Sequence, residues 1–157
     1  MPEKDDVLDL IEDLIETCKD GETGYAHAAG VVSDPNLKAY FSEQSLERAR
    51  CIAELSEASR RLLGERPEKS GSVAATLHRV WFEAKADIGL GDQAILNSVE
   101  QGEDSAKKAY EKALAAELPD ELRHLVQRQA KRVIAAHDHV RDLRDGNITE
   151  NRERRVA

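Results

Sequence analysis

Four long stretches of this chain repeat apolar residues every three or four positions, which is the period of an amphipathic α-helix. Proline or glycine separates them, with a Ser33-Asp34-Pro35 start signal after the first stretch and Leu118-Pro119-Asp120 before the last. The expected helices cover about residues 5–32, Pro35 to Gly64, about residues 92–116, and Asp120 to Gly146. Short turns inside each pair force the two helices of that pair to lie antiparallel.

The composition agrees with one all-helical domain. The 157 residues are enough to bury a sizeable core, and aromatic residues make up only 4% of them. Turn-forming residues are scarce, with 9 Gly and 4 Pro, which favours a helical fold over a β-sandwich or barrel. The net charge of −8 argues against a nucleic-acid partner.

Localisation is predicted from the distribution of apolar residues. No apolar run approaches the ~18 residues that a membrane span requires, and the N-terminal residues do not follow the signal-peptide pattern. We therefore expect a cytoplasmic protein without a membrane partner. Its two cysteines are expected to be free thiols in a reducing compartment.

A long connection separates the two helical pairs, and its residues 73–88 have the apolar stripe of a short helix. Two antiparallel helical hairpins joined by such a crossover predict an all-α, ferritin-like four-helix bundle. We expect this bundle to occupy residues 1–146, followed by a polar, disordered tail over residues 147–157. Trp81 is expected to dock the crossover against the bundle or a second subunit, so a homodimer or larger homo-oligomer is predicted.

A Gly-Glu pair interrupts the middle of the first and third expected helices, at Gly21-Glu22 and Gly102-Glu103. A glycine inside a helix costs about 1 kcal/mol relative to alanine, so it usually has a packing or functional reason. The apolar stripes place both glutamates towards the bundle axis, where an unpaired carboxylate is expensive. They are therefore either members of buried ion pairs or metal ligands.

Several short motifs occur in a fixed order over about residues 5–145. They are Asp20-Gly21-Glu22-x-Gly24-Tyr25, Gly71-Ser72-Val73, Trp81, Gly102-Glu103-Asp104-x-x-Lys107-Lys108-Ala109-Tyr110, His137 and Val140-Arg141-Asp142-Leu143-Arg144-Asp145. Together they resemble a bacterial ferritin-like four-helix-bundle family of unknown function, within the ferritin/rubrerythrin-like superfamily. The resemblance loosely implies a role in stress tolerance.

Active di-iron members of that superfamily take a glutamate from each of the first and third helices and a Glu-x-x-His from each of the others. The resemblance places Glu22 and Glu103 on the single-glutamate positions and His137 on the fourth-helix histidine. The second-helix positions fall on Arg48 and Cys51, and the fourth helix lacks its glutamate. Three of the six ligands remain, and a cation replaces another, which counts against a di-iron site.

Arg48 favours a degenerate centre without a cofactor, in which its guanidinium clamps Glu22 and Glu103 in a buried ion-pair network. A structural, interaction or stress-related protein that is not an enzyme follows from this interpretation. In the alternative, Glu22, Glu103 and His137 bind iron, manganese or zinc in a metal-binding protein or ferroxidase-like oxidase.

The two cysteines form a separate candidate. Counting outward from the turn near Ser33-Asp34 puts Cys18 and Cys51 at the same height on antiparallel helices, so their sulfurs are expected to be neighbours. Three roles are open: small buried hydrophobic residues, a redox-sensitive thiol pair, or two thiolates that join His137 at a zinc site.

Overall fold

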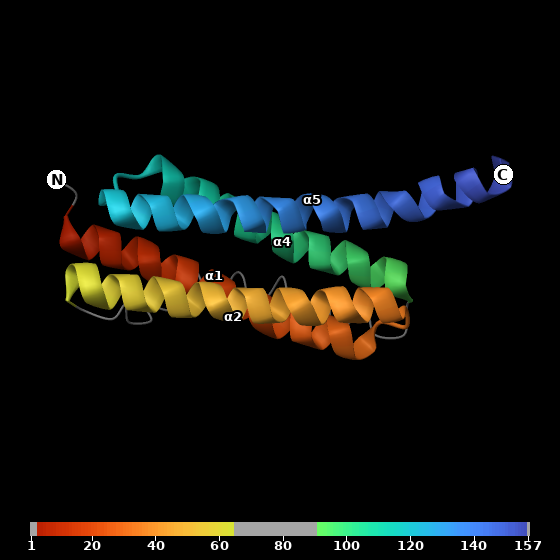
Figure 1. The fold of residues 1–157 in the computed structure, drawn as a ribbon, viewed down its shortest axis with the longest axis horizontal. Helices are drawn as coiled ribbons and strands as arrows, with labels where there is room; N and C mark the ends of the chain where they lie inside the picture. Colours follow the sequence, from red (N-terminus) through yellow and green to blue (C-terminus); the bar gives the residue numbers. More distant parts are fainter. Residues whose placement is uncertain (1–2, 65–90, 157) are drawn as a thin grey trace.

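The computed structural model describes residues 3–64 and 91–156, with side chains up to residue 146, and these residues form four long helices without a strand (Figure 1). The helices are α1 (Lys4–Val31), α2 (Pro35–Leu63), α4 (Asp92–Ala115) and α5 (Asp120–Val156). The prediction of an all-α four-helix bundle is confirmed. The expected crossover helix over residues 73–88, with Trp81, lies outside the described residues.

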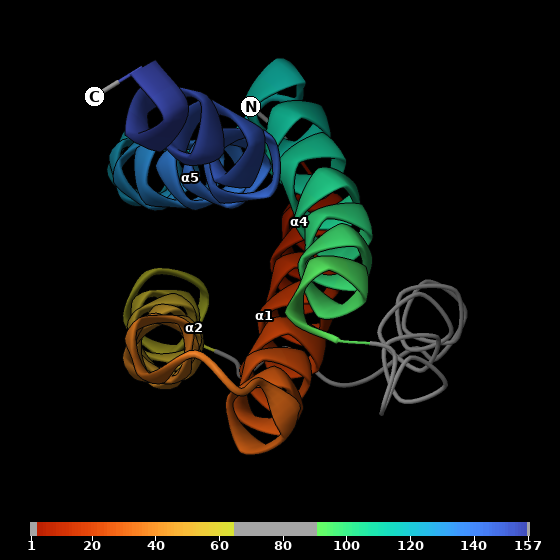
Figure 2. The same cartoon turned by 90° about the vertical axis from the view of Figure 1, so that its right-hand side faces the viewer.

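The four helices form two antiparallel hairpins, α1 with α2 and α4 with α5, as Figure 1 shows. In Figure 2, α2 and α5 lie on one side of the bundle and α1 and α4 on the other. The backbones pack closely within each hairpin and between α1 and α4, whereas α2 and α5 pack least closely among the neighbouring helices. Long side chains must therefore fill the space between α2 and α5.

Buried apolar side chains form two clusters, one towards each end of the bundle. Every helix contributes to both clusters and passes from one to the other near its middle, for example between Cys18 and Tyr25 in α1 and between Val99 and Ala106 in α4. The residues at this level include the buried polar side chains of Arg48, Glu103 and His137. A polar layer therefore divides the core in two.

Capping and helix-breaking residues set the limits of α2. Asp34 is its N-cap and accepts a hydrogen bond from the backbone N–H of Asn36 at 2.7 Å, and Pro35 opens the helix. Gly64 ends it in the left-handed conformation, with φ of 74°. Both limits agree with the prediction.

The predicted end of the last helix is wrong. Helix α5 continues through Gly146 to Val156, so the tail that we expected to be disordered is helical over most of its length. A single glycine costs a helix only about 1 kcal/mol, and here no proline or left-handed cap follows it. Glycine alone is therefore insufficient to end α5.

The start of α4 is attached to the turn between α1 and α2. The Asp92 carboxylate accepts hydrogen bonds from the backbone N–H groups of Ser33 at 2.7 Å and Asp34 at 2.9 Å. Because these donors lie at the turn of the first hairpin, one side chain holds the end of that hairpin against the second. This contact joins residues that are 58 and 59 positions apart in sequence.

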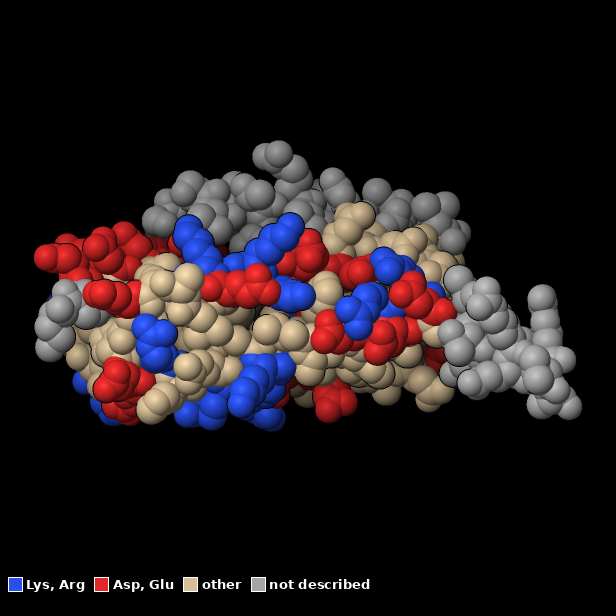
Figure 3. Space-filling view, turned by 90° about the horizontal axis from the view of Figure 1, so that it is seen from above, with Lys and Arg blue, Asp and Glu red and all other residues tan. Residues whose placement is uncertain are grey.

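Charges of both signs are interspersed on the face shown in Figure 3, without a broad area of one sign. A surface that binds nucleic acid would instead collect Lys and Arg on one face. None of the described helices is long and apolar enough to cross a membrane.

Candidate functional site

A buried ion pair joins α2 to α4 at the middle of the bundle. Arg48 Nη2 donates to Glu103 Oε1 at 2.5 Å, and the two side chains are 1% and 0% exposed. Arg48 is the largest fully buried side chain among the described residues. The structure thus brings together two members of the predicted network.

Glu22 does not join this pair, so the predicted three-residue network is a two-residue contact. Glu22 is half-buried, and among the described residues it makes no ion pair with Arg48. Gly21 is the member of its Gly-Glu pair that faces Arg48. Because successive helix residues are rotated by about 100°, the next side chain, Glu22, turns towards the rim.

The glycine in the middle of α1 makes room for the guanidinium. A Cβ atom at Gly21 would lie 3.2 Å from Arg48 Nη1 and 3.3 Å from Arg48 Cγ. One turn further along α1, the ring centroid of Tyr25 lies 5.6 Å from Arg48 Cζ, which is a cation–π distance. Gly21 and Tyr25 therefore form the α1 side of the cradle that holds Arg48.

Burial dominates the electrostatics of the pair. It raises the pKa of Glu103 above that of an ordinary carboxyl, against the opposing effects of Arg48, the Tyr25 hydroxyl and His137. Burial also lowers the pKa of Arg48, but Glu103 and, to a smaller extent, Tyr25, Cys18 and Tyr110 together outweigh this and raise the pKa, so the guanidinium stays protonated. The pair is joined by one hydrogen bond, because Arg48 Nη1 and Glu103 Oε2 are buried without a hydrogen-bond partner among the described residues.

His137, the third predicted metal ligand, is 8% exposed at the border between α4 and α5. Its Nδ1 lies 3.1 Å from Asp138 Oδ1, and its Nε2 lies 3.7 Å from Asp104 Oδ1. Over residues 3–64 and 91–146, no three His, Cys, Asp or Glu side chains are grouped as a metal ion would require. The structure therefore does not assemble Glu22, Glu103 and His137 into a ligand set.

Cys18 and Cys51 do lie together, one helical turn from the ion pair. Both are free thiols and both are buried, with 0% and 1% exposure. The two residues belong to the same buried cluster, and each thiol is near enough to shift the pKa of the other. Neither cysteine forms a zinc site with His137 in the described structure.

A chain of hydrogen bonds continues from this thiol pair to α5. Cys18 Sγ lies 3.1 Å from the Tyr110 hydroxyl, which donates to Gln129 Oε1 at 2.8 Å. Gln129 Nε2 donates to the Cys51 carbonyl at 3.3 Å and to Glu54 Oε1 at 3.1 Å. We did not identify Gln129 from sequence, although a polar residue beside the apolar stripe of α5 was the available signal.

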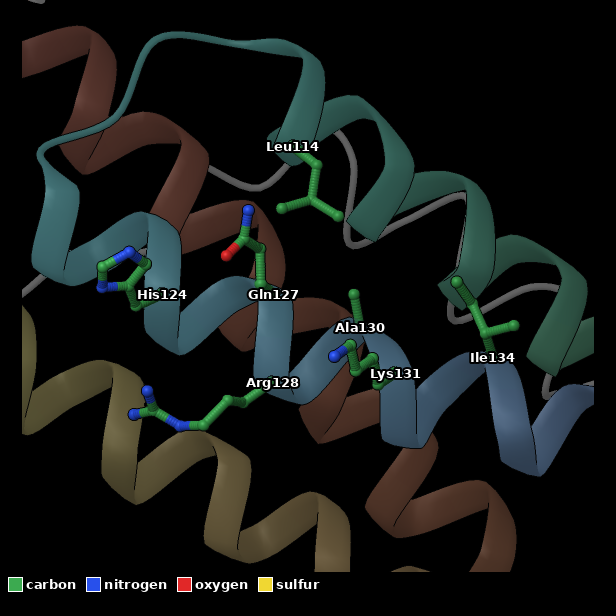
Figure 4. A pocket seen from close by; sticks show the side chains of 7 residues that line it. All are labelled: Leu114, His124, Gln127, Arg128, Ala130, Lys131 and Ile134. Atoms are coloured by element: carbon green, nitrogen blue, oxygen red, sulfur yellow. The ribbon is translucent and has the colours of Figure 1, made fainter.

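An open hollow of about 540 Å³ lies on the outside of α4 and α5, away from these buried groups (Figure 4). Its lining consists of Leu114 from α4 and six residues from α5: His124, Gln127, Arg128, Ala130, Lys131 and Ile134. No carboxylate and no member of the buried pairs lines it. It therefore does not extend either buried site to the surface.

Removal of the Glu103 carboxylate is expected to be strongly destabilising. Glu103→Ala leaves the Arg48 charge buried without a counter-charge, so the free energy of unfolding should fall by about 3–5 kcal/mol. The matched control is Glu22→Ala, which changes the other Gly-Glu pair and should cost less than about 1 kcal/mol. Urea denaturation measures both.

A neutral core should recover the lost stability. The double variant Arg48→Met/Glu103→Leu removes both charges together and should regain most of what Glu103→Ala loses. Equal losses for Glu103→Ala and Glu22→Ala would contradict the assignment of Glu103 as the partner of Arg48.

Gly21→Ala is expected to destabilise the protein although alanine is the better helix former. The new methyl group displaces Arg48 from its cradle, and such overpacking typically costs about 1–3 kcal/mol. Gly30→Ala in the same helix is the control, because no atom lies within 4 Å of its Cβ position. It should be neutral or stabilise by up to about 1 kcal/mol. Thermal and urea melts measure both variants. If Gly21→Ala is more stable than Gly30→Ala, the cradle is refuted.

Comparison with known proteins places the chain in a family. The sequence model of a family described as "Domain of unknown function (DUF2383)" matches residues 6–116. No curated protein matches the chain significantly. The matched span is more than half of the chain and includes the buried ion pair and both cysteines. The chain belongs to the DUF2383 family.

Proposed function

We propose that this chain is a non-catalytic structural or interaction protein in which an arginine–glutamate pair takes the place of a bound metal ion. The observation that carries the proposal is the contact of Arg48 with Glu103 at zero or near-zero exposure. The guanidinium supplies the positive charge that a metal would supply, and it uses one of the carboxylate oxygens. A divalent ion beside it would be repelled.

Burial also argues against chemistry at this centre. A catalytic carboxylate must touch its substrate, or reach it through one water molecule. Glu103 is 0% exposed, and the hollow on the surface has none of the buried groups in its lining. The pair therefore supports a role in holding α2 and α4 in register rather than in turnover.

The resemblance to ferritin-like proteins supports descent from a carboxylate metal site and a stress-related role. We propose a cytoplasmic location from the sequence pattern. We further propose that the chain forms a homodimer or a larger homo-oligomer and binds neither nucleic acid nor membranes. The mixed charges of the face in Figure 3 are in keeping with a protein partner. Light scattering of the full chain should give a multiple of the 17.4 kDa chain mass, and a monomer would contradict the oligomer.

One observation favours a second function, the binding of iron, manganese or zinc. Glu103 Oε2 is buried without a hydrogen-bond partner among the described residues, and the charge of His137 lowers the pKa of Glu103. Glu103 and His137 are therefore within electrostatic reach of each other. A metal would require Arg48 to leave its cradle and Glu22 to turn inward.

Elemental analysis distinguishes the two functions. Protein purified from cells grown with iron, manganese and zinc should contain well below one ion per chain, because Arg48 already neutralises Glu103. Addition of each metal to the purified protein should leave the melting temperature unchanged. Stoichiometric metal that is lost in Glu103→Ala but kept in the surface variant Glu111→Ala would establish the metal-binding function instead.

A further inference from the structure

We propose that Cys18 and Cys51 form a peroxide-reactive dithiol, in which Cys18 attacks the peroxide and Cys51 then closes a disulfide between α1 and α2. The proposal goes beyond the structural role above, since it assigns a chemical reaction to a site beside the ion pair. The substrate class is a small hydroperoxide such as hydrogen peroxide.

The two thiols are placed for mutual reaction. They project from facing positions on the antiparallel helices α1 and α2, both are free, and both are buried. Both belong to the same buried cluster and each shifts the pKa of the other, so the second thiol lies beside the atom that the peroxide would oxidise. A sulfenic acid formed on Cys18 would condense with this neighbouring thiol to a disulfide.

Cys18 belongs to an apolar cluster, but its thiol also contacts the hydroxyl of Tyr110, which a purely structural cysteine does not need. Gln129 Nε2 donates to the Cys51 carbonyl and to Glu54, so its Oε1 accepts the single proton of the Tyr110 hydroxyl. In this arrangement the Cys18 thiol donates to Tyr110. When Cys18 ionises, the Tyr110 hydroxyl can turn its proton to the thiolate, where the hydrogen bond is charge-assisted.

The two thiols differ in acidity. The hydrogen bond from Cys51 lowers the pKa of Cys18 against the effect of burial, and the Arg48 charge and Tyr110 lower it further. The same contact raises the pKa of Cys51 well above the usual range. Arg48 lies one helical turn from Cys51 on α2, and its Nη1 has no hydrogen-bond partner among the described residues. Cys18 is therefore the nucleophile, and Cys51 remains a thiol until it resolves the intermediate.

The seam between α2 and α5 borders the pair at Cys51, and among neighbouring helices these two backbones pack least closely. Polar side chains close this seam: Gln129, and Arg132 paired with Glu47 and with Glu54. Arg132 and Glu54 are 37% and 35% exposed, so rotation of long side chains opens the way without separation of the helices. A small hydrogen-bonding molecule such as hydrogen peroxide would reach the buried thiols through this seam.

The reaction balances without a metal. The Cys18 thiolate attacks one oxygen of the peroxide, the O–O bond breaks, and the departing hydroxide takes a proton to become water. The Cys51 thiol then attacks the Cys18 sulfenic sulfur, and the S–O bond breaks as the S–S bond forms, which releases a second water. Two thiols lose two electrons and two protons, and the peroxide is reduced to two waters. An external dithiol resets the pair by thiol–disulfide exchange.

The test is a titration of the full, reduced chain with hydrogen peroxide, followed by denaturation and thiol counting. We expect both thiols to disappear together, with loss of two hydrogen atoms in the intact mass of the monomeric chain and full recovery in dithiothreitol. In Cys51→Ser, a 1,3-dione reagent should capture sulfenic acid on Cys18. Cys18→Ser should react at least tenfold more slowly than Cys51→Ser.

Tyr110→Phe tests the positioning of the nucleophile. It should raise the apparent pKa in the pH profile of the reaction, while the rate at high pH stays close to wild type. Melting curves establish that each variant is folded before it is compared.

Three outcomes overturn the proposal. In the first, both thiols of the folded chain survive a peroxide concentration that oxidises the denatured chain. In the second, the disulfide forms only between two chains. In the third, the two serine variants react at equal rates. An unchanged pH profile in Tyr110→Phe would remove Tyr110 from the mechanism and overturn that part of it.

Discussion

The rest of the bundle depends on one desolvated contact, the ion pair between Arg48 and Glu103. Because neither charge reaches water, each is tolerable only while the other is present. The glycine at position 21 and the ring of Tyr25 shape the space around the guanidinium. The apolar residues on either side of the pair form two separate clusters, so the contact also fixes where the helices must lie along one another.

The ion pair and the thiol pair are neighbouring layers of the same interior. Cys18 and Gly21 are one turn apart on α1, as are Cys51 and Arg48 on α2. The guanidinium that neutralises Glu103 therefore also lowers the pKa of Cys18. Arg48, which argues against a metal centre, thus also supplies the nearby positive charge that favours a reactive thiolate.

Much of this arrangement could be predicted from single residues and their spacing. Asp34, Pro35 and Gly64 mark the limits of α2 because capping and left-handed termination are local effects. The proximity of Cys18 and Cys51 followed from counting along an antiparallel hairpin. The prediction was wrong at Gly146, where the local cost of glycine was too small to end the helix, and at Glu22, where one step of helix rotation separates the rim from the axis.

By itself, the sequence determined the helical segments, the antiparallel pairing within each hairpin, and the presence of polar groups on apolar stripes, because all three depend on periodicity and short turns. Only the tertiary structure decided which of the two Gly-Glu pairs presents its glutamate to Arg48 and which presents its glycine. It also decided that Tyr110 and Gln129 connect the thiols to α5. These choices depend on how each helix is rotated about its axis, which is set by packing between side chains far apart in the chain.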